Sequence, residues 1–313
     1  MEQKNNSDLV TLAIPIYNVC DFVERALLSA LNQTYNNIEF LIIDDRGTDN
    51  SMAIVDDIII HHIRGKEARI ITHPVNIGLG ATRNSAIEHA KGKFIFFMDS
   101  DDAITPDCIQ KLVAKIIETD LDVICGSYNR IEKNVSSYFT GFHVPVWNKL
   151  YKLSFLRANN IKCIPSHLME DVFFYVQVLV KTHSYLVIPD ITYHYYIRVH
   201  TPPKDWDERI YNDWRQVPVD YMNVLNESSV DIQTRIKLRK KIFWLAIGVS
   251  GMASKSSHNV QHYINEYLNP KFFKNKDIFR SWVLMLAYII SCMPLGIKKI
   301  LLALHIKFFF KYK

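Results

Sequence analysis

Three carboxylates lie directly after one of the most apolar segments of the chain. Asp99, Asp101 and Asp102 follow residues 95–98, which are all apolar or aromatic. Three carboxylates within four residues repel one another unless a cation is present. Oxygen ligands of this kind suit Mg²⁺ or Mn²⁺ shared with a diphosphate. The cluster therefore predicts a metal site for a phosphorylated substrate, and a solvated acidic turn that caps the next helix is the alternative.

Two further acidic pairs contain side chains that could bind a substrate or act as a base. Asp44-Asp45 follows an apolar run and can accept hydrogen bonds from a base N–H or a ribose hydroxyl, although its turn-rich surroundings also fit an Asx turn. Glu170-Asp171 opens a predicted helix, where acids commonly meet the positive end of the helix dipole. A functional Asp171 would be a general base that deprotonates an attacking hydroxyl.

The basic candidates are less specific. In the mixed run of residues 193–201, Arg198 or His200 could reach a diphosphate or a metal, and a structural histidine is the alternative. Arg83 lies on a glycine-bearing helix start that matches neither the dinucleotide fingerprint nor the phosphate loop of nucleoside triphosphatases. It could meet a nucleotide or a phosphate, or lie on the surface. No Ser-His-Asp, Cys-His or zinc-ligand spacing stands out.

Strands and helices alternate in the part of the chain that carries these groups. Strands are predicted at residues 10–14, 39–43, 69–72 and 93–98, and helices at 51–63 and 79–90. A further helix precedes the second strand, and Asn18 is expected to cap it. This order predicts an α/β fold with a mostly parallel sheet flanked by helices. Ligands of such sheets lie outside the carboxyl ends of the strands, so the clusters should converge on one crevice.

The pattern changes along the rest of the chain. A helix capped by Thr105 comes next, then a strand at 122–126, a loop and short helix at 147–159, a helix at 170–181, strands at 186–188 and 191–198, and helical periodicity to about residue 268. We expect three parts, which are a catalytic α/β domain at 1–205, a helical extension at 206–270 and a basic, apolar tail at 271–313.

Charge sets the tail apart. The 313-residue chain has a net charge of +5, but the tail holds nine basic residues and one acidic residue, which leaves the body at −3. Residues 282–293 are apolar apart from Ser291, a run shorter than the roughly 20 residues that span a bilayer. The tail therefore predicts an in-plane or re-entrant membrane anchor, with a buried hairpin or a dimer interface as the alternative. An acidic body argues against a nucleic-acid-binding protein.

Cysteine usage bears on the compartment. The five cysteines are scattered and have no C-x-x-C spacing, which excludes a disulfide framework or a zinc ribbon and favours a reducing environment. The first eight residues are polar, so no secretory signal is expected. Together with the tail, the scattered cysteines and the polar start of the chain predict a peripheral or monotopic protein at the cytoplasmic face of the cell membrane. A homo-oligomer is a further expectation.

Taken together, the clusters resemble the family-2 glycosyltransferases of the GT-A fold, the inverting type of bacterial polysaccharide synthesis. The resemblance covers about residues 9–201 and preserves the order of several spaced motifs: Pro15-x-Tyr17-Asn18, Ser29-x-x-Asn32-Gln33-Thr34, Asp44-Asp45-x-Gly47-Thr48-Asp49-x-Ser51, Asn76-x-Gly78-x-x-x-x-Arg83-Asn84, Asp99-Ser100-Asp101-Asp102, Trp147-Asn148-Lys149-Leu150 and Glu170-Asp171. The usual Asp-Asp-Gly-Ser appears here with Arg46 and Gly47 in its last two positions.

The resemblance implies roles for individual residues. Pro15, Tyr17 and Asp45 would line the nucleobase pocket, and Asp45 would accept from the base. Arg83 would approach the base or the diphosphate, and Asp99 would hold the ribose or the sugar, with Ser100 and Arg198 counted among the donor-binding residues. Asp101 would bind Mg²⁺ or Mn²⁺, with His200 as a second candidate ligand. Asp171 would be the catalytic base supported by Glu170, and Trp147 and Lys149 would border the acceptor.

The resemblance implies the transfer of a hexose or N-acetylhexosamine from a nucleoside diphosphate sugar to an acceptor hydroxyl, with inversion at the anomeric carbon. A UDP-sugar is the donor that the family most often uses. The basic tail suggests a lipid-linked saccharide acceptor. A non-catalytic sugar-nucleotide-binding or scaffold subunit of a membrane assembly is the main alternative. A nucleotidylyltransferase would need a glycine-rich, basic phosphate loop, which is absent at residues 14–19.

Overall fold

The computed structural model describes residues 8–133, 135–164, 170–182 and 184–198, together with a few short pieces between residues 232 and 298. The chain divides into two compact units, Met1–Pro202 and Pro203–Lys313. Nearly all of the predicted helical extension (206–270) and basic tail (271–313) lies outside the described residues. Within the part that is described, no helix is both long enough and apolar enough to cross a bilayer.

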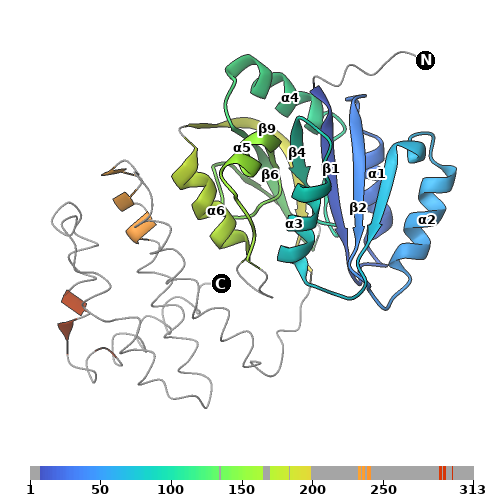
Figure 1. Ribbon diagram of the computed structural model, residues 1–313, viewed down its shortest axis with the longest axis horizontal. Coiled ribbons are helices and arrows are strands. Elements are labelled where there is room, and N and C mark those ends of the chain that lie inside the picture. The colour runs from blue at the N-terminus through green and yellow to red at the C-terminus, as the bar shows by residue number, and fades with distance from the viewer. Residues whose placement is uncertain are drawn as a thin grey trace. The chain divides into compact units, whose positions relative to one another are not determined.

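A nine-stranded sheet forms the centre of the first unit (Figure 1). Its strand order is β3-β2-β1-β4-β8-β6-β9-β5, and β7 pairs with β6. The strands are β1 (Val10–Ile16), β2 (Ile38–Asp44), β3 (Ala68–Thr72), β4 (Phe94–Phe97), β5 (Ala103–Ile104), β6 (Val123–Glu132), β7 (Val135–Phe139), β8 (Lys149–Lys152) and β9 (Tyr185–Tyr196).

The two halves of the sheet differ in strand direction. Strands β3, β2, β1 and β4 run parallel to one another, as the alternation of strands and helices predicts. In the second half β8 runs antiparallel to β4 and β6, β7 antiparallel to β6, and β5 antiparallel to β9, while β6 and β9 are parallel. The sheet is therefore mixed, and its parallel half carries the acidic turn at the end of β4.

Helices cover both faces of the sheet. One face packs against α1 (Val23–Leu31), α2 (Ser51–His61) and α4 (Cys108–Thr119), and the other against α3 (Leu79–His89), α5 (Leu153–Ala158) and α6 (Glu170–Lys181) (Figure 1). A short 3₁₀ turn, η2 (Gly65–Glu67), precedes β3. Phe40 and Ile42 point to the first face, and Leu41 and Ile43 to the second. Because both faces of the sheet are buried, residues 40–43 of β2 are all apolar rather than alternately apolar and polar.

Most predicted boundaries lie within one or two residues of those in the structure, but the strand predicted at 122–126 continues to Glu132 in β6, and three other predictions differ more in kind. The first helix begins at Val23, and Asn18 does not cap it. Instead, Asn18 has a positive φ of 49°, and its side-chain oxygen accepts a hydrogen bond from the Thr48 backbone N–H at 2.7 Å. The helix predicted from Thr105 begins at Cys108, after Asp107. The two strands predicted around residue 190 form one strand, β9.

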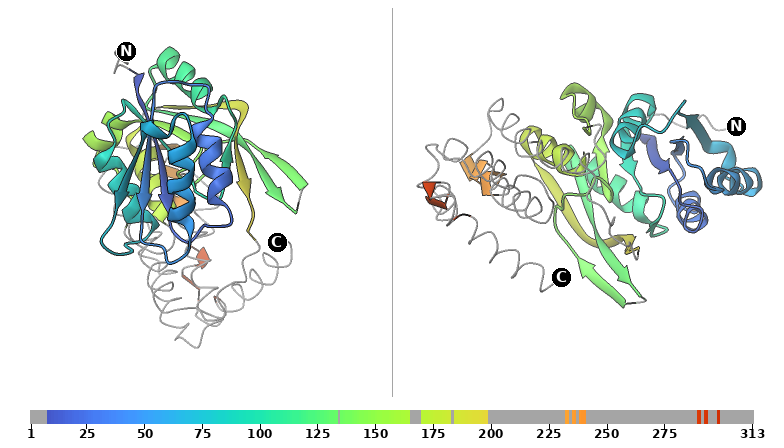
Figure 2. Two further views of the ribbon diagram at one scale, coloured as in Figure 1. Left: turned by 90° about the vertical axis from the view of Figure 1, so that its right-hand side faces the viewer. Right: turned by 90° about the horizontal axis from the view of Figure 1, so that it is seen from below.

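The hairpin of β6 and β7 projects from the body of the unit, where Figure 2 shows it as a pair of green strands. It adds an arm to the second half of the sheet, and the aromatic rings of Tyr128 and Phe139 stack across it at 5.3 Å. Strand β9, in the same half of the sheet, runs beside the acidic turn, where Tyr193 and Tyr196 bond to Asp102.

Candidate active site

The acidic turn of residues 99–102 follows β4, in the middle of the sheet. One carboxylate oxygen from each of Asp99, Asp101 and Asp102 lies within 4.8 Å of the others. The apolar strand explains why the acidic turn lies at the end of β4. Residues 94–97 are all buried, and the strand ends where the polar residues of the turn begin. Ser100 lies in the same turn and is buried.

Asp102 differs from the other two carboxylates because the protein uses both of its oxygens. Its side chain is fully buried, Oδ2 accepts from the Tyr193 hydroxyl at 2.8 Å, and Oδ1 accepts from the Tyr196 backbone N–H at 2.9 Å. Burial, together with the charges of Asp99 and Asp101, raises the pKa of Asp102 to about 8. Asp102 thus joins the acidic turn to β9, and Asp99 and Asp101 remain as the accessible pair.

Asp102→Asn is expected to make stability less dependent on pH. The folded protein holds the Asp102 proton more tightly than the unfolded chain does, so its contribution to stability falls as pH rises from about 4 to about 8. The asparagine oxygen can still accept from Tyr196 but does not titrate. Urea unfolding in EDTA at pH 5 and pH 8 measures the change, with the exposed Asp56→Asn as the matched control. An unchanged difference between the two pH values would contradict the assignment.

Two arginines contact Asp101, and each of them packs on an aromatic ring. Arg198 Nε lies 2.5 Å from Asp101 Oδ2, and an Arg25 N–H donates to the Asp101 backbone oxygen, also at 2.5 Å. The Arg25 guanidinium lies 3.7 Å from the centre of the Tyr196 ring, and that of Arg198 lies 4.8 Å from the Phe22 ring centre. Burial and the charge of Asp99 raise the pKa of Asp101. The structure brings Arg198 to the acidic turn, and it adds Arg25, which the sequence motifs did not indicate.

Arg83 connects the acidic turn with the start of α6. Its guanidinium is almost fully buried, and one N–H donates to Asp99 Oδ1 at 2.8 Å. Nη1 donates to Glu170 Oε1 at 3.0 Å and also bonds to Asp171 Oδ1. One side chain on α3 thus binds three carboxylates from two other elements. We call Arg83, Asp99, Glu170 and Asp171 the arginine cluster.

The arginine cluster shifts the titration of its members. Burial raises the pKa of Asp171, and the neighbouring cations Arg83 and Lys149 oppose this shift. Burial and the charge of Asp171 raise the pKa of Glu170 to about 7. Burial alone would lower the pKa of Arg83, but the three carboxylates raise it well above its usual value. Perturbed carboxyl groups that meet at a strand end are typical of catalytic sites.

Close packing of α3 against the segment before α6 sets the position of Glu170 and Asp171. A Cβ atom on Gly80 would lie 2.3 Å from the Ile164 backbone oxygen and 3.1 Å from Glu170 Cβ, so only glycine fits there. Next to Arg83, the Asn84 side chain donates to the Cys163 carbonyl at 2.8 Å and accepts from the Cys163 N–H at 2.8 Å.

Asp45 lies beside the loop between β3 and α3 and is buried. Its carboxylate accepts from Asn76 Nδ2 at 2.9 Å and from the backbone N–H groups of Ile77 and Gly78 at 3.0 Å, and His73 Nδ1 lies 2.8 Å away. These four contacts match the roughly four lone-pair sites of a carboxylate. In this structure Asp45 therefore organises the loop.

The other residues of the predicted base pocket differ in exposure. Pro15 is half-buried in β1, and the Tyr17 ring is 47% exposed just beyond it. Tyr17 therefore presents an open aromatic face at the carboxyl edge of the parallel strands. Arg46 follows with a positive φ of 58°.

The two predicted acceptor residues are buried. Trp147 stacks on Tyr193 at 4.5 Å and on Tyr195 at 5.3 Å between ring centres. Lys149 Nζ donates to the Pro145 carbonyl at 2.5 Å, and burial lowers the pKa of Lys149. Neither side chain presents a polar group to solvent. His200 lies outside the described residues.

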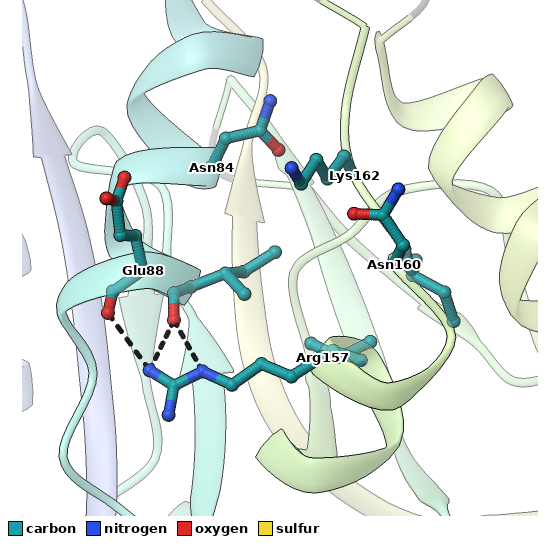
Figure 3. Close-up of a pocket in the computed structure, with 8 residues that line it drawn as sticks. Asn84, Glu88, Arg157, Asn160 and Lys162 are labelled. Carbon is teal, nitrogen blue, oxygen red and sulfur yellow. Dashed lines mark hydrogen bonds between the residues drawn. The ribbon is translucent and has the colours of Figure 1, made fainter.

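A separate hollow of about 450 Å³ lies between α3 and α5 (Figure 3). Its eight lining residues are Asn84, Ile87, Glu88, Leu156, Arg157, Asn160, Ile161 and Lys162. The Arg157 guanidinium donates to the Ile87 and Glu88 carbonyls at the end of α3, as the dashed lines in Figure 3 show. The hollow shares no lining residue with the arginine cluster or the acidic turn.

The model of one protein family, glycosyl transferase family 2, matches residues 11–177, which hold the acidic turn and the arginine cluster. The chain belongs to this family. Among curated relatives, a putative glycosyltransferase EpsH of Bacillus subtilis is 31% identical over 64% of this chain and 64% of its own length. An uncharacterized glycosyltransferase of Haemophilus influenzae is 37% identical over 39% of this chain and 48% of its own. The chain spans about a third to two thirds of the length of such relatives.

A solved structure of similar fold confirms the fold. TarS of Staphylococcus aureus (residues 1–349), in a crystal structure with UDP-GlcNAc, superposes with a TM-score of 0.70 over 90% of this chain and 89% of its own, at 17% identity. The expected GT-A fold is therefore confirmed for this family-2 chain.

Proposed function

We propose that the protein is an inverting glycosyltransferase. It transfers a hexose or N-acetylhexosamine from a nucleoside diphosphate sugar, with a UDP-sugar as the first candidate, to a saccharide hydroxyl in the synthesis of a cell-surface polysaccharide. The observation that carries the proposal is the arginine cluster, because it brings the Asp171 carboxylate beside the acidic turn that ends β4. The EpsH relative and the UDP-GlcNAc complex of TarS support the reaction class and the donor.

Asp171 acts as the general base in this proposal. An acceptor hydroxyl attacks the anomeric carbon from the face opposite the leaving diphosphate, and Asp171 takes its proton, so the configuration inverts. One base is enough, because the leaving diphosphate needs no protonation by a second carboxyl group, unlike the leaving group of a glycosidase. Glu170, bonded to the same guanidinium, supports the base.

The donor occupies the carboxyl edge of the parallel strands. The open ring of Tyr17, beside Pro15, stacks on the nucleobase, and Asp45 shapes the adjoining loop. Arg198, next to Asp101, and Ser100 line the diphosphate side. Arg198 keeps further N–H groups that can donate to phosphate oxygens.

The acidic turn fits a divalent metal. Asp99 and Asp101 supply the hard, anionic oxygens that Mg²⁺ and Mn²⁺ prefer, and the carboxylates lie close enough to share one ion. These two residues would hold the ion, with His200 as a further candidate ligand. A bound ion would supply charge stabilisation for the departing diphosphate.

A donor panel tests the proposal. Purified protein is incubated with UDP-, GDP- and dTDP-sugars, with Mn²⁺, Mg²⁺ or EDTA, and with membrane lipid extract as the source of acceptor. Release of one nucleoside diphosphate together with labelled product, lost in EDTA, supports a metal-dependent transferase and identifies its donor. Saturable nucleotide binding with no turnover in the presence of the extract would instead support the scaffold role.

The tail is proposed to hold the protein on the inner surface of the membrane, near a lipid-linked acceptor. Its basic and apolar composition is the support for this proposal. A chain that lacks residues 278–313 is expected to move from the membrane fraction to the supernatant when cells are lysed and sedimented. A truncated chain that stays with the membranes would contradict the anchor.

A further inference from the structure

Arg83 combines nearly complete burial with three acidic partners. Its side chain is 1% exposed, whereas the side chains of Asp99 and Asp171 are 22% and 24% exposed. The guanidinium therefore lies behind these two carboxylates, on the side away from solvent. Its terminal nitrogens are used by Asp99, Glu170 and Asp171, and the remaining Nε is buried without a hydrogen-bond partner.

This geometry leaves Arg83 no open face toward a donor. A diphosphate could bond to it only by displacing a carboxylate that is already paired in a buried site, which is costly. The resemblance to family-2 enzymes implies that Arg83 approaches the base or the diphosphate. Arg25 and Arg198, beside Asp101, are the guanidiniums on the accessible side of the turn.

The contacts of Arg83 also orient both carboxylates. It binds Oδ1 of Asp99 and Oδ1 of Asp171, and within the described residues no bond to Oδ2 of either is seen. Each carboxylate thus has one oxygen bonded to Arg83 and, among the described residues, a second that is not. A general base must hold its free oxygen within hydrogen-bond reach of the proton it removes.

We propose that Arg83 is a positioning residue that fixes the Asp171 base relative to the acidic turn and does not bind the donor. The inference rests on the proposed transferase function, because it assigns Asp171 as the base. A planar guanidinium can bind three carboxylates in fixed directions, whereas a lysine ammonium is a point charge on a flexible chain. The position therefore requires arginine for its shape as well as its charge.

Arg83→Lys separates this role from donor binding. We expect kcat to fall by about 10²-fold, since a misplacement of roughly 1 Å in a reacting group costs that much. The affinity for UDP, measured by calorimetry with Mn²⁺ present, is expected to stay at the wild-type value. Arg69→Lys, at an ion-paired arginine of β3, is the matched control and should leave kcat unchanged.

A second variant guards against poor folding of the first. Arg83→Lys/Glu170→Gln removes one of the three acids that compete for the ammonium, so it should be more stable than Arg83→Lys and recover part of kcat. Loss of UDP affinity in either variant with kcat retained would overturn the proposal, as would full activity in a folded Arg83→Lys protein. Wild-type protein that turns over no donor at all would instead count against the proposed function.

Discussion

Asp171→Asn is expected to slow glycosyl transfer by about 10³-fold, the usual contribution of a positioned general base. The substitution keeps the shape of the side chain, and the asparagine oxygen can still accept from Arg83 as the Asp171 carboxylate does. The amide that replaces the second oxygen cannot take a proton from the acceptor hydroxyl. Initial rates with the donor that the panel identifies, at saturating acceptor, measure the effect.

Donor binding and folding should survive this substitution. Asp171 is one of three acids that share one arginine in the buried arginine cluster, so removing its negative charge relieves repulsion rather than creating an unpaired charge. UDP affinity is therefore expected to be retained, and the exposed Asp56→Asn on α2 serves as the control. A variant that keeps the wild-type rate would show that another group removes the proton.

Phe97→Ala is expected to lower the free energy of unfolding by about 3–5 kcal/mol, the range for phenylalanine in a packed core. Phe97 is buried, and its ring centre lies 6.1 Å from those of Tyr151 on β8 and Phe174 on α6. The rings of Tyr151 and Phe174 also meet each other, at 5.6 Å. The cavity would thus open where three elements that support the site join.

Chemical denaturation followed by tryptophan fluorescence and circular dichroism measures this loss. Phe97→Leu is the graded control, because it keeps most of the apolar volume and should cost less. Tyr138→Ala, at a 51% exposed ring on β7, should have a small effect. A loss for Phe97→Ala no greater than that for Tyr138→Ala would contradict the packing role.

The parallel half of the fold follows from local patterns. Strands β1 to β4 are apolar and alternate regularly with helices, so their order is readable from the sequence. The predicted helix at 170–181 corresponds to α6 (Glu170–Lys181). The antiparallel half is harder to predict. Strand β8 has four residues, too few to show a period, and β5 has two. In β9, Pro189 lies where the pairing with β6 shifts register, and a bulge lets the strand continue past a residue that suggests a break.

The candidate site was predictable where it depends on strand ends. The acidic turn after β4 and the acids that open α6 were identified because polar residues there follow or begin strong patterns. The contacts of Arg83 were not predictable, because its partner Asp171 is 88 positions away along the chain. The burial of Lys149 and Trp147 could not be predicted from the sequence either, since it depends on how β6, β8 and β9 pack together.

The bond between Asp102 and Tyr193 also has a consequence for the chain during synthesis. These residues are 91 positions apart, and the residues of β8 that pair with β4 follow it by about 55 positions. At roughly 5–20 residues per second, the ribosome takes about 5–20 s to reach Tyr193 from Asp102, and about 3–11 s to reach β8 from β4. Until β8 is made, β4 is an open sheet edge on a nascent chain. We expect the neighbouring carboxylates to hinder its pairing with another unfinished chain, so residues proposed for catalysis also protect against misassembly.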